Sequence, residues 1–138
     1  MKKTISLLLA LCFLAIATVP VFAAQSPWGV EPQRYTCISS PRVSYSEDNS
    51  MYTCSGKARV RNSATTKMDL YLQTSYDGGV TYKDTYLLDS KQFTGDGEYS
   101  VYGTKKKLSS DCKCRTALYI KVYNSKGQLI DSAEVYSD

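Results

Sequence analysis

The chain has 138 residues, of which 43% are apolar, 12% aromatic and 22% charged, and its formal net charge is +4. This composition is typical of one globular domain and excludes disordered and collagen-like chains. Histidine is absent, which excludes Ser-His-Asp and Cys-His nucleophiles, histidine-ligated metal sites and an imidazole pH switch.

The first 23 residues have the pattern of a cleaved export signal. Lys2 and Lys3 are followed by an apolar run over 5–19, and Val21-Phe22-Ala23 fits a signal peptidase site. We predict cleavage after Ala23, or after the neighbouring Ala24, and secretion of the protein. The alternative is a membrane anchor, but the apolar run of about 15 residues is shorter than the roughly 20 that span a bilayer.

Two further features of the N-terminal region bear on localisation and partners. Cys12 follows the bulky Leu11, which does not fit a lipidation site, so we expect no stable membrane anchor. Cleavage removes two lysines and leaves a nearly neutral chain, so no nucleic-acid partner is expected. Residues 24–34 contain two prolines and predict an extended leader, whose Trp28 either folds back onto the domain or contacts a ligand.

From residue 35 to 138 the apolar pattern has a period of two, which predicts β-strands and no helix. The clearest strands are expected over 52–60, 68–74 and 116–122, and weaker ones over 42–46, 80–88, 98–106 and 128–136. Turn residues rich in Gly, Asp and Asn separate them. About seven strands in about 100 residues predict an all-β, antiparallel immunoglobulin-like β-sandwich.

The cysteines outside the signal are Cys37, Cys54, Cys112 and Cys114. An even number in a small exported chain predicts two disulfides. A bridge between Cys112 and Cys114 would be strained, so we expect Cys54 to pair with Cys112 or Cys114, and Cys37 with the other. The alternative is a thiolate metal site or a redox pair, although redox motifs usually have two intervening residues and structural zinc needs a pair at each end. We predict no metal and no cofactor.

Residues 75–82 resemble the Asp-box, Ser-x-Asp-x-Gly-x-Thr-aromatic, of sialidases and other secreted β-proteins. The matching positions are Ser75, Asp77, Gly79, Thr81 and Tyr82. An Asp side chain accepts hydrogen bonds from turn amides, and glycine tolerates positive φ. The resemblance implies a structural hairpin, since the motif lies away from the active site in those proteins.

Basic and aromatic residues supply two candidate surfaces. Lys105, Lys106 and Lys107, with Lys57, Arg59 and Arg61, either form a patch for an anionic ligand or guard a strand end against edge-to-edge pairing. All 12 tyrosines follow the signal, and Tyr71, Tyr119 and Tyr123 fall on outward faces of predicted strands. Exposed tyrosines suit recognition, but they are also good strand formers.

The layout resembles small secreted proteins of unknown function from Gram-positive, clostridia-like bacteria. The resemblance rests on the segments Tyr52-Thr53-Cys54-Ser55-Gly56, Leu70-Tyr71-Leu72-Gln73 and 119–123, with a Gly-rich hairpin between them. It implies an exported β-sandwich and carries no activity.

No motif for catalysis is present in the sequence, so we expect a secreted, non-enzymatic module that binds a cell-surface protein or glycan. The first alternative is a carbohydrate-active hydrolase with two carboxylates about 5–9.5 Å apart. The second is a secreted membrane-active toxin. Neither the ligand nor the oligomeric state follows from the sequence.

Overall fold

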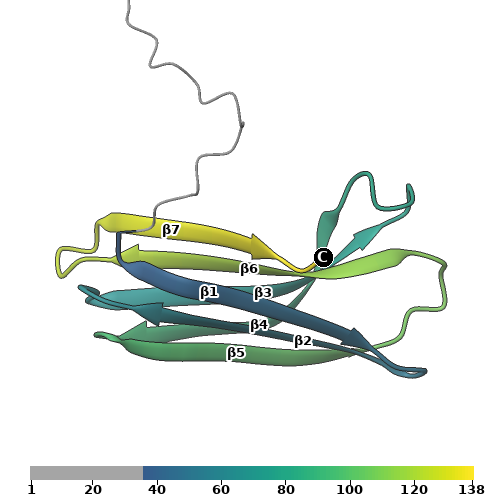
Figure 1. Ribbon diagram of the computed structural model, residues 1–138, viewed down its shortest axis with the longest axis horizontal. Helices are drawn as coiled ribbons and strands as arrows, with labels where there is room; N and C mark the ends of the chain where they lie inside the picture. Colours follow the sequence, from purple (N-terminus) through teal and green to yellow (C-terminus); the bar gives the residue numbers. More distant parts are fainter. Residues whose placement is uncertain (1–35) are drawn as a thin grey trace, which may run out of the picture. The chain divides into compact units, whose positions relative to one another are not determined.

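A computed structural model describes residues 36–138, which form seven β-strands in two packed layers (Figure 1). The signal peptide, its cleavage site, the leader 24–34 and Trp28 lie outside the described residues. The strands are β1 (Ile38–Glu47), β2 (Met51–Val60), β3 (Thr65–Ser75), β4 (Lys83–Thr94), β5 (Gly97–Lys106), β6 (Lys113–Tyr123) and β7 (Leu129–Tyr136).

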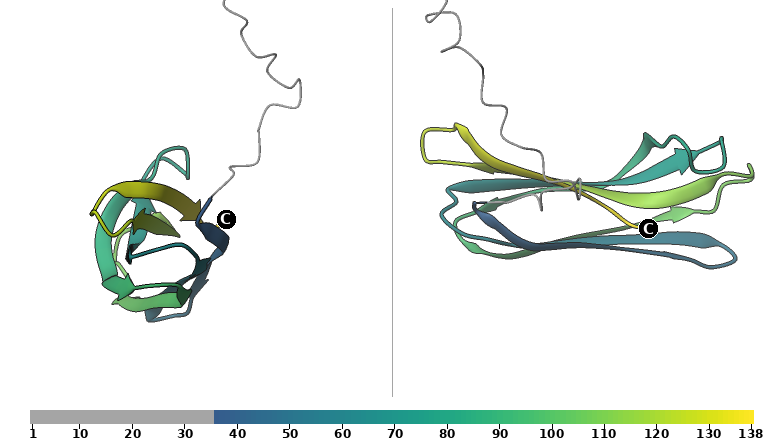
Figure 2. Two further views of the ribbon diagram at one scale, coloured as in Figure 1. Left: turned by 90° about the vertical axis from the view of Figure 1, so that its left-hand side faces the viewer. Right: turned by 45° about the horizontal axis from the view of Figure 1, so that its top comes forward.

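The strands form a three-stranded sheet in the order β1-β2-β5 and a four-stranded sheet in the order β4-β3-β6-β7. Every neighbouring pair is antiparallel. Viewed along the strands, the two sheets face each other across the core (Figure 2). The predicted all-β sandwich is confirmed. Its fourth strand pairs with β3, whereas in constant-type immunoglobulin domains the fourth strand joins the sheet of the fifth.

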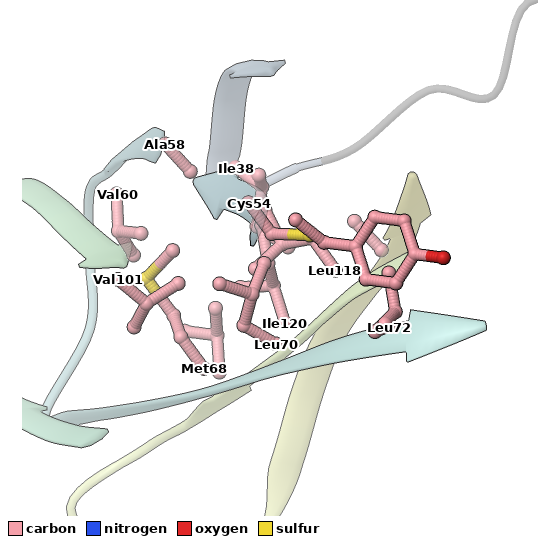
Figure 3. Packing of buried hydrophobic residues seen from close by; sticks show 13 residues of the cluster. Ile38, Cys54, Ala58, Val60, Met68, Leu70, Leu72, Val101, Leu118 and Ile120 are labelled. Carbon is pink, nitrogen blue, oxygen red and sulfur yellow. The ribbon is translucent and has the colours of Figure 1, made fainter. Parts of the chain in front are cut away.

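Alternate side chains of β2, β3 and β6 fill the space between the sheets (Figure 3). Because successive residues of a strand point to opposite faces, one apolar residue in two is enough to build this core. Gly56 leaves room for Leu118 of the opposite sheet, since a Cβ atom on Gly56 would lie 2.7 Å from Leu118 Cδ1. The wholly buried core residues include Cys54, Val60, Met68, Leu70, Leu72, Leu118, Ile120 and Val122.

The fourth strand differs most from the prediction, since it runs over Lys83–Thr94 and not over 80–88. Val80 lies in the preceding turn with 82% of its side chain exposed, because the turn around Asp77 extends to Thr81. The strand continues beyond residue 88 because its pairing with β3 extends to Thr65 opposite Thr94.

The two sheets approach each other at both margins. On one side, a Cβ atom on Gly103 of β5 would lie 2.6 Å from Leu88 Cβ of β4, and Asp89 accepts a hydrogen bond from the Tyr102 amide at 3.1 Å. On the other side, Asp131 of β7 accepts a hydrogen bond from the Cys37 amide at 2.6 Å. These contacts leave the outer faces of the sheets as the broad surfaces that are free to carry a binding site. No helix within residues 36–138 could cross a membrane.

Candidate binding face

Three tyrosines lie together on the outer face of the four-stranded sheet. The strand register places Tyr71, Ala117 and Tyr136 side by side on β3, β6 and β7. The ring centroids of Tyr71 and Tyr119 are 5.6 Å apart and those of Tyr119 and Tyr136 are 6.4 Å apart, with both pairs edge-to-face. This geometry is favourable for aromatic pairs, and it leaves the small Ala117 fully buried among the rings.

Arg115 extends this cluster toward the hairpin that joins β3 and β4. Its guanidinium carbon lies 4.0 Å from the centroid of the Tyr82 ring and 4.4 Å from that of Tyr136. Its Nε donates a hydrogen bond of 2.7 Å to Gln73 Oε1. Two cation–π contacts and one hydrogen bond therefore hold the guanidinium in one orientation. We call Tyr71, Tyr82, Arg115, Tyr119 and Tyr136 the tyrosine–arginine face.

A hydrogen-bond network lies beneath this face. Gln73, only 4% exposed, donates through Nε2 to Asp84 Oδ1 at 2.7 Å and to the Tyr119 hydroxyl at 3.3 Å. The Tyr119 hydroxyl in turn donates to Asp84 at 3.0 Å. Burial raises the pKa of Tyr119, and hydrogen bonds with Tyr136 and Asp84 raise it further. The network keeps Tyr119 protonated and fixes its ring.

The face contains two of the three tyrosines that the sequence singles out. Tyr123 lies at the far end of β6, paired with Thr65 and Leu129, and makes none of the ring contacts of the face. Arg115, Gln73 and Tyr136 were missed. A signal was present for Arg115, because it has the same strand phase as Tyr119, but it precedes the predicted start of that strand.

The hairpin after β3 is organised by Asp77. Its Oδ1 accepts hydrogen bonds from the Ser75 hydroxyl and from the amides of Val80 and Thr81, and its Oδ2 accepts from the Thr81 hydroxyl. Gly79 adopts a positive φ of 96° in this turn. Tyr82 ends the turn and packs on Arg115, so the hairpin positions one wall of the tyrosine–arginine face.

Beside this hairpin lies a hollow of about 560 Å³. Tyr76, 68% exposed, lines it together with Thr74, Thr81, Lys83 and Thr85. The exposed ring of Tyr76 therefore extends the aromatic surface beyond the hairpin.

The predicted basic run does not gather into one patch. Lys105 Nζ lies 4.3 Å from the Tyr86 ring centroid, Lys107 forms an ion pair with Glu47, and Lys106 is exposed. Lys57 and Arg59 pair with Glu98, near the opposite end of the β2–β5 pair. With Arg42 and Arg61, they line a separate hollow of about 520 Å³ on the outer face of the three-stranded sheet.

The cysteines differ from the predicted pairing. All four described cysteines are free thiols, and Cys112 Sγ lies 3.7 Å from Cys114 Sγ. Cys54 is fully buried and contacts the Thr116 hydroxyl, two residues along β6 from Cys114. Cys37 lies at the other end of the sandwich, where its carbonyl accepts a hydrogen bond from the Arg61 amide. The alternation of residues along the strands predicted that the side chains of Cys54 and Cys114 both point into the core. The two residues lie at different positions along the sandwich, however, because Cys54 is opposite Thr116 and Cys114 is opposite Tyr52.

No group of three or more Cys, Asp or Glu side chains within residues 36–138 is placed to hold a metal ion. Comparisons with protein-family models, curated proteins and solved structures found no match. The resemblance to secreted Gram-positive proteins therefore stays a prediction, and the function is argued from the geometry of the site.

Proposed function

We propose that the protein is a secreted, non-enzymatic binding module that recognises a cell-surface protein or glycan through its tyrosine–arginine face. The observation that carries this proposal is Arg115, which is held between the rings of Tyr82 and Tyr136 on an open sheet face. Secretion is supported by the export signal in the sequence.

The composition and rigidity of the face suit recognition. Tyrosine and arginine are enriched among the residues that dominate binding energies. Binding normally costs about 0.5–1.5 kcal/mol for each side chain that becomes immobilised. Contacts with Gln73, Asp84 and neighbouring rings already immobilise Arg115 and Tyr119, so much of this cost is met before a ligand arrives.

The carboxyl groups near this face do not support the hydrolase alternative. Asp84 accepts hydrogen bonds from Gln73 and Tyr119, and Glu134 accepts one from Tyr136. Hydrogen bonds to Ser75 and Thr81 hold the pKa of Asp77 well below its usual range. A general acid in a glycosidase needs a raised pKa, whereas the surroundings of Asp77 favour its ionised carboxylate. No observation favours the membrane-active toxin.

Immobilised full-length protein should be tested with a glycan array and with solubilised cell-envelope extract. We expect a ligand from one of the two at micromolar concentration. Binding should fall at least about tenfold in Tyr136→Ala, because loss of an aromatic residue that dominates an interface typically costs more than about 1.4 kcal/mol.

Tyr102→Ala is the matched control. Tyr102 is 59% exposed on β5 of the other sheet, whereas Tyr136 is 38% exposed. The control variant should bind like the unmodified protein. Absence of any captured ligand, or equal loss in the two variants, would contradict the proposal.

A further inference from the structure

Two cysteines separated by one residue lie where β6 begins. Cys112 directly precedes the strand and Cys114 is its second residue. Both side chains are half-buried, and their Sγ atoms are 3.7 Å apart. A disulfide joins sulfurs about 2.0 Å apart, so a short side-chain movement separates the observed arrangement from a bond.

The neighbouring structure anchors both ends of the loop that connects β5 to β6. At the start of the connecting loop, the Lys107 amide donates a hydrogen bond of 2.8 Å to the Ser50 carbonyl, and Leu108 packs against the core. At its end, Cys114 contacts the hydroxyl of Tyr52, whose side chain is only 2% exposed. The loop is therefore anchored before the pair, and Cys114 is anchored at the start of β6.

The other described cysteines do not compete for these thiols. Cys54 lies in the core beside Thr116, and Cys37 lies beside Asp131 at the opposite end of the sandwich. A bond from Cys54 to Cys114 would require movement of a paired strand, since strand pairing fixes the positions of both residues. The local pair needs no such movement.

We propose that Cys112 and Cys114 form a thiol–disulfide exchange pair whose substrate is a linear disulfide. The Cys112 thiolate attacks one sulfur of the substrate, forming a mixed disulfide and releasing the other sulfur as a thiolate. The Cys114 thiolate then attacks Cys112 Sγ, closing the Cys112–Cys114 bond and releasing the second substrate thiolate. Protons lost from the two cysteines are taken up by the two product thiolates, so the substrate is reduced and the pair is oxidised.

The two cysteines have different roles because Cys112 lies in the loop before β6, whereas Cys114 lies within the strand and contacts the hydroxyl of Tyr52. Burial, followed by a hydrogen bond with Cys112, raises the pKa of the Cys114 thiol to about 11. Because the thiolate is the nucleophile, Cys114 is a poor first attacker at neutral pH. Once Cys112 has become part of a mixed disulfide, Cys114 is already beside the sulfur that it must attack.

The ring closed by this bond contains a single intervening residue, Lys113. So short a loop departs from the geometry that a disulfide prefers, and strained disulfides are the more easily reduced and exchanged ones. The pair therefore suits reversible exchange better than permanent stapling of the fold.

Oxidised glutathione is a suitable probe for the full chain. After acid quenching, alkylation and tryptic digestion, we expect peptide 108–115 to have lost two hydrogens, or its fragments 108–113 and 114–115 to be joined by a disulfide. The oxidised fraction should vary with the ratio of oxidised glutathione to the square of reduced glutathione. Bonds from either cysteine to the peptide 35–42 or 43–57 would overturn the proposal.

Serine variants distinguish the cysteine that attacks the substrate from the cysteine that resolves the mixed disulfide. Cys114→Ser should accumulate glutathione on Cys112, whereas Cys112→Ser should react at Cys114 at least about tenfold more slowly, because the remaining thiol has a raised pKa. Cys37→Ser is the control, since Cys37 is half-buried and distant, and this variant should form the local bond normally. Stable glutathione on Cys112 in the unmodified protein, or equal reactivity of the two variants, would overturn the assignment.

Discussion

Arg115 illustrates how one side chain can organise a surface. The guanidinium is planar, so its two faces can meet two rings while its edge donates to Gln73. A lysine at this position could provide charge but neither the flat surface nor the fixed donor. The arginine therefore connects the hairpin, β3 and β7 through a single residue of β6.

Replacing Arg115 with lysine should destabilise the fold by about 1–3 kcal/mol, because the nearly buried oxygen of Gln73 loses its donor. Urea unfolding followed by tyrosine fluorescence measures this change. Arg42→Lys, at an exposed position of β1, is the control and should change stability by less than about 0.5 kcal/mol. Equal unfolding midpoints for the two variants would mean that the Arg115 contacts do not stabilise the fold.

Among the elements, the hairpin from Ser75 to Tyr82 depends most on one group. Hydroxyls of Ser75 and Thr81, together with the Thr81 amide, lower the pKa of Asp77. The fold gains from the ionised carboxylate above the ordinary aspartate pKa of about 3.9, and this gain is lost as the pH falls through the lowered folded value. The hairpin therefore resists mild acid.

We predict that the Asp77 carboxyl titrates well below pH 3.9 or so, the ordinary aspartate value. Carbon-detected NMR of the carboxyl group, with the Thr81 amide proton shift as a second probe, measures this titration. In Asp77→Asn the acidic transition of the Thr81 amide should disappear. A titration midpoint at the ordinary value would show that the turn bonds do not stabilise the ionised form.

Most of the strands could be predicted from the alternation of apolar and polar residues and from the turn residues between them. Tyr52 to Val60 has one buried residue in two, and this pattern predicts a strand with one buried face. The end of β4 could not be predicted, because it depends on pairing with β3 down to Thr65. Local sequence contains no information about that partner.

The site was harder to predict than the fold. Strand phase predicted that Tyr71 and Tyr119 face outward, but only the register between β3 and β6 brings their rings together. The predicted cysteine pairing failed for the same reason, because alternation shows which way a side chain points but not which residue of the opposite sheet it meets. Cys54 contacts Thr116, whereas Cys114 contacts Tyr52.

At the scale of the whole molecule, pairs of tyrosine rings pack together on both sheets. Tyr45 and Tyr52 stack with ring centroids 6.3 Å apart on the three-stranded sheet, and Tyr119 and Tyr136 meet on the four-stranded sheet. Burial is the main reason that the pKa of each of these four tyrosines is raised, and it raises that of Tyr52 to about 12. The neutral phenols stabilise the fold fully below the ordinary pKa of about 10, and this contribution is lost as the pH rises through the raised folded values.

We predict that an alkaline titration followed at 295 nm has a late phase, well above the ordinary tyrosine pKa of about 10. The tyrosines with a raised pKa, which include Tyr52 with its pKa of about 12, should ionise only as circular dichroism reports loss of the sheets. Ionisation of all tyrosines in one step near the ordinary pKa, with the β-sheet signal intact, would contradict the buried environments.

Recognition through the tyrosine–arginine face is tested most directly by hydroxyl-radical footprinting of the protein alone and with the glycan or envelope component that it captures. We predict that the bound ligand lowers side-chain oxidation at Tyr71, Tyr119 and Tyr136 and leaves Tyr102 on the other sheet unchanged. Unchanged oxidation at these three tyrosines, with protection of Tyr102 and its neighbours on β5, would contradict the account.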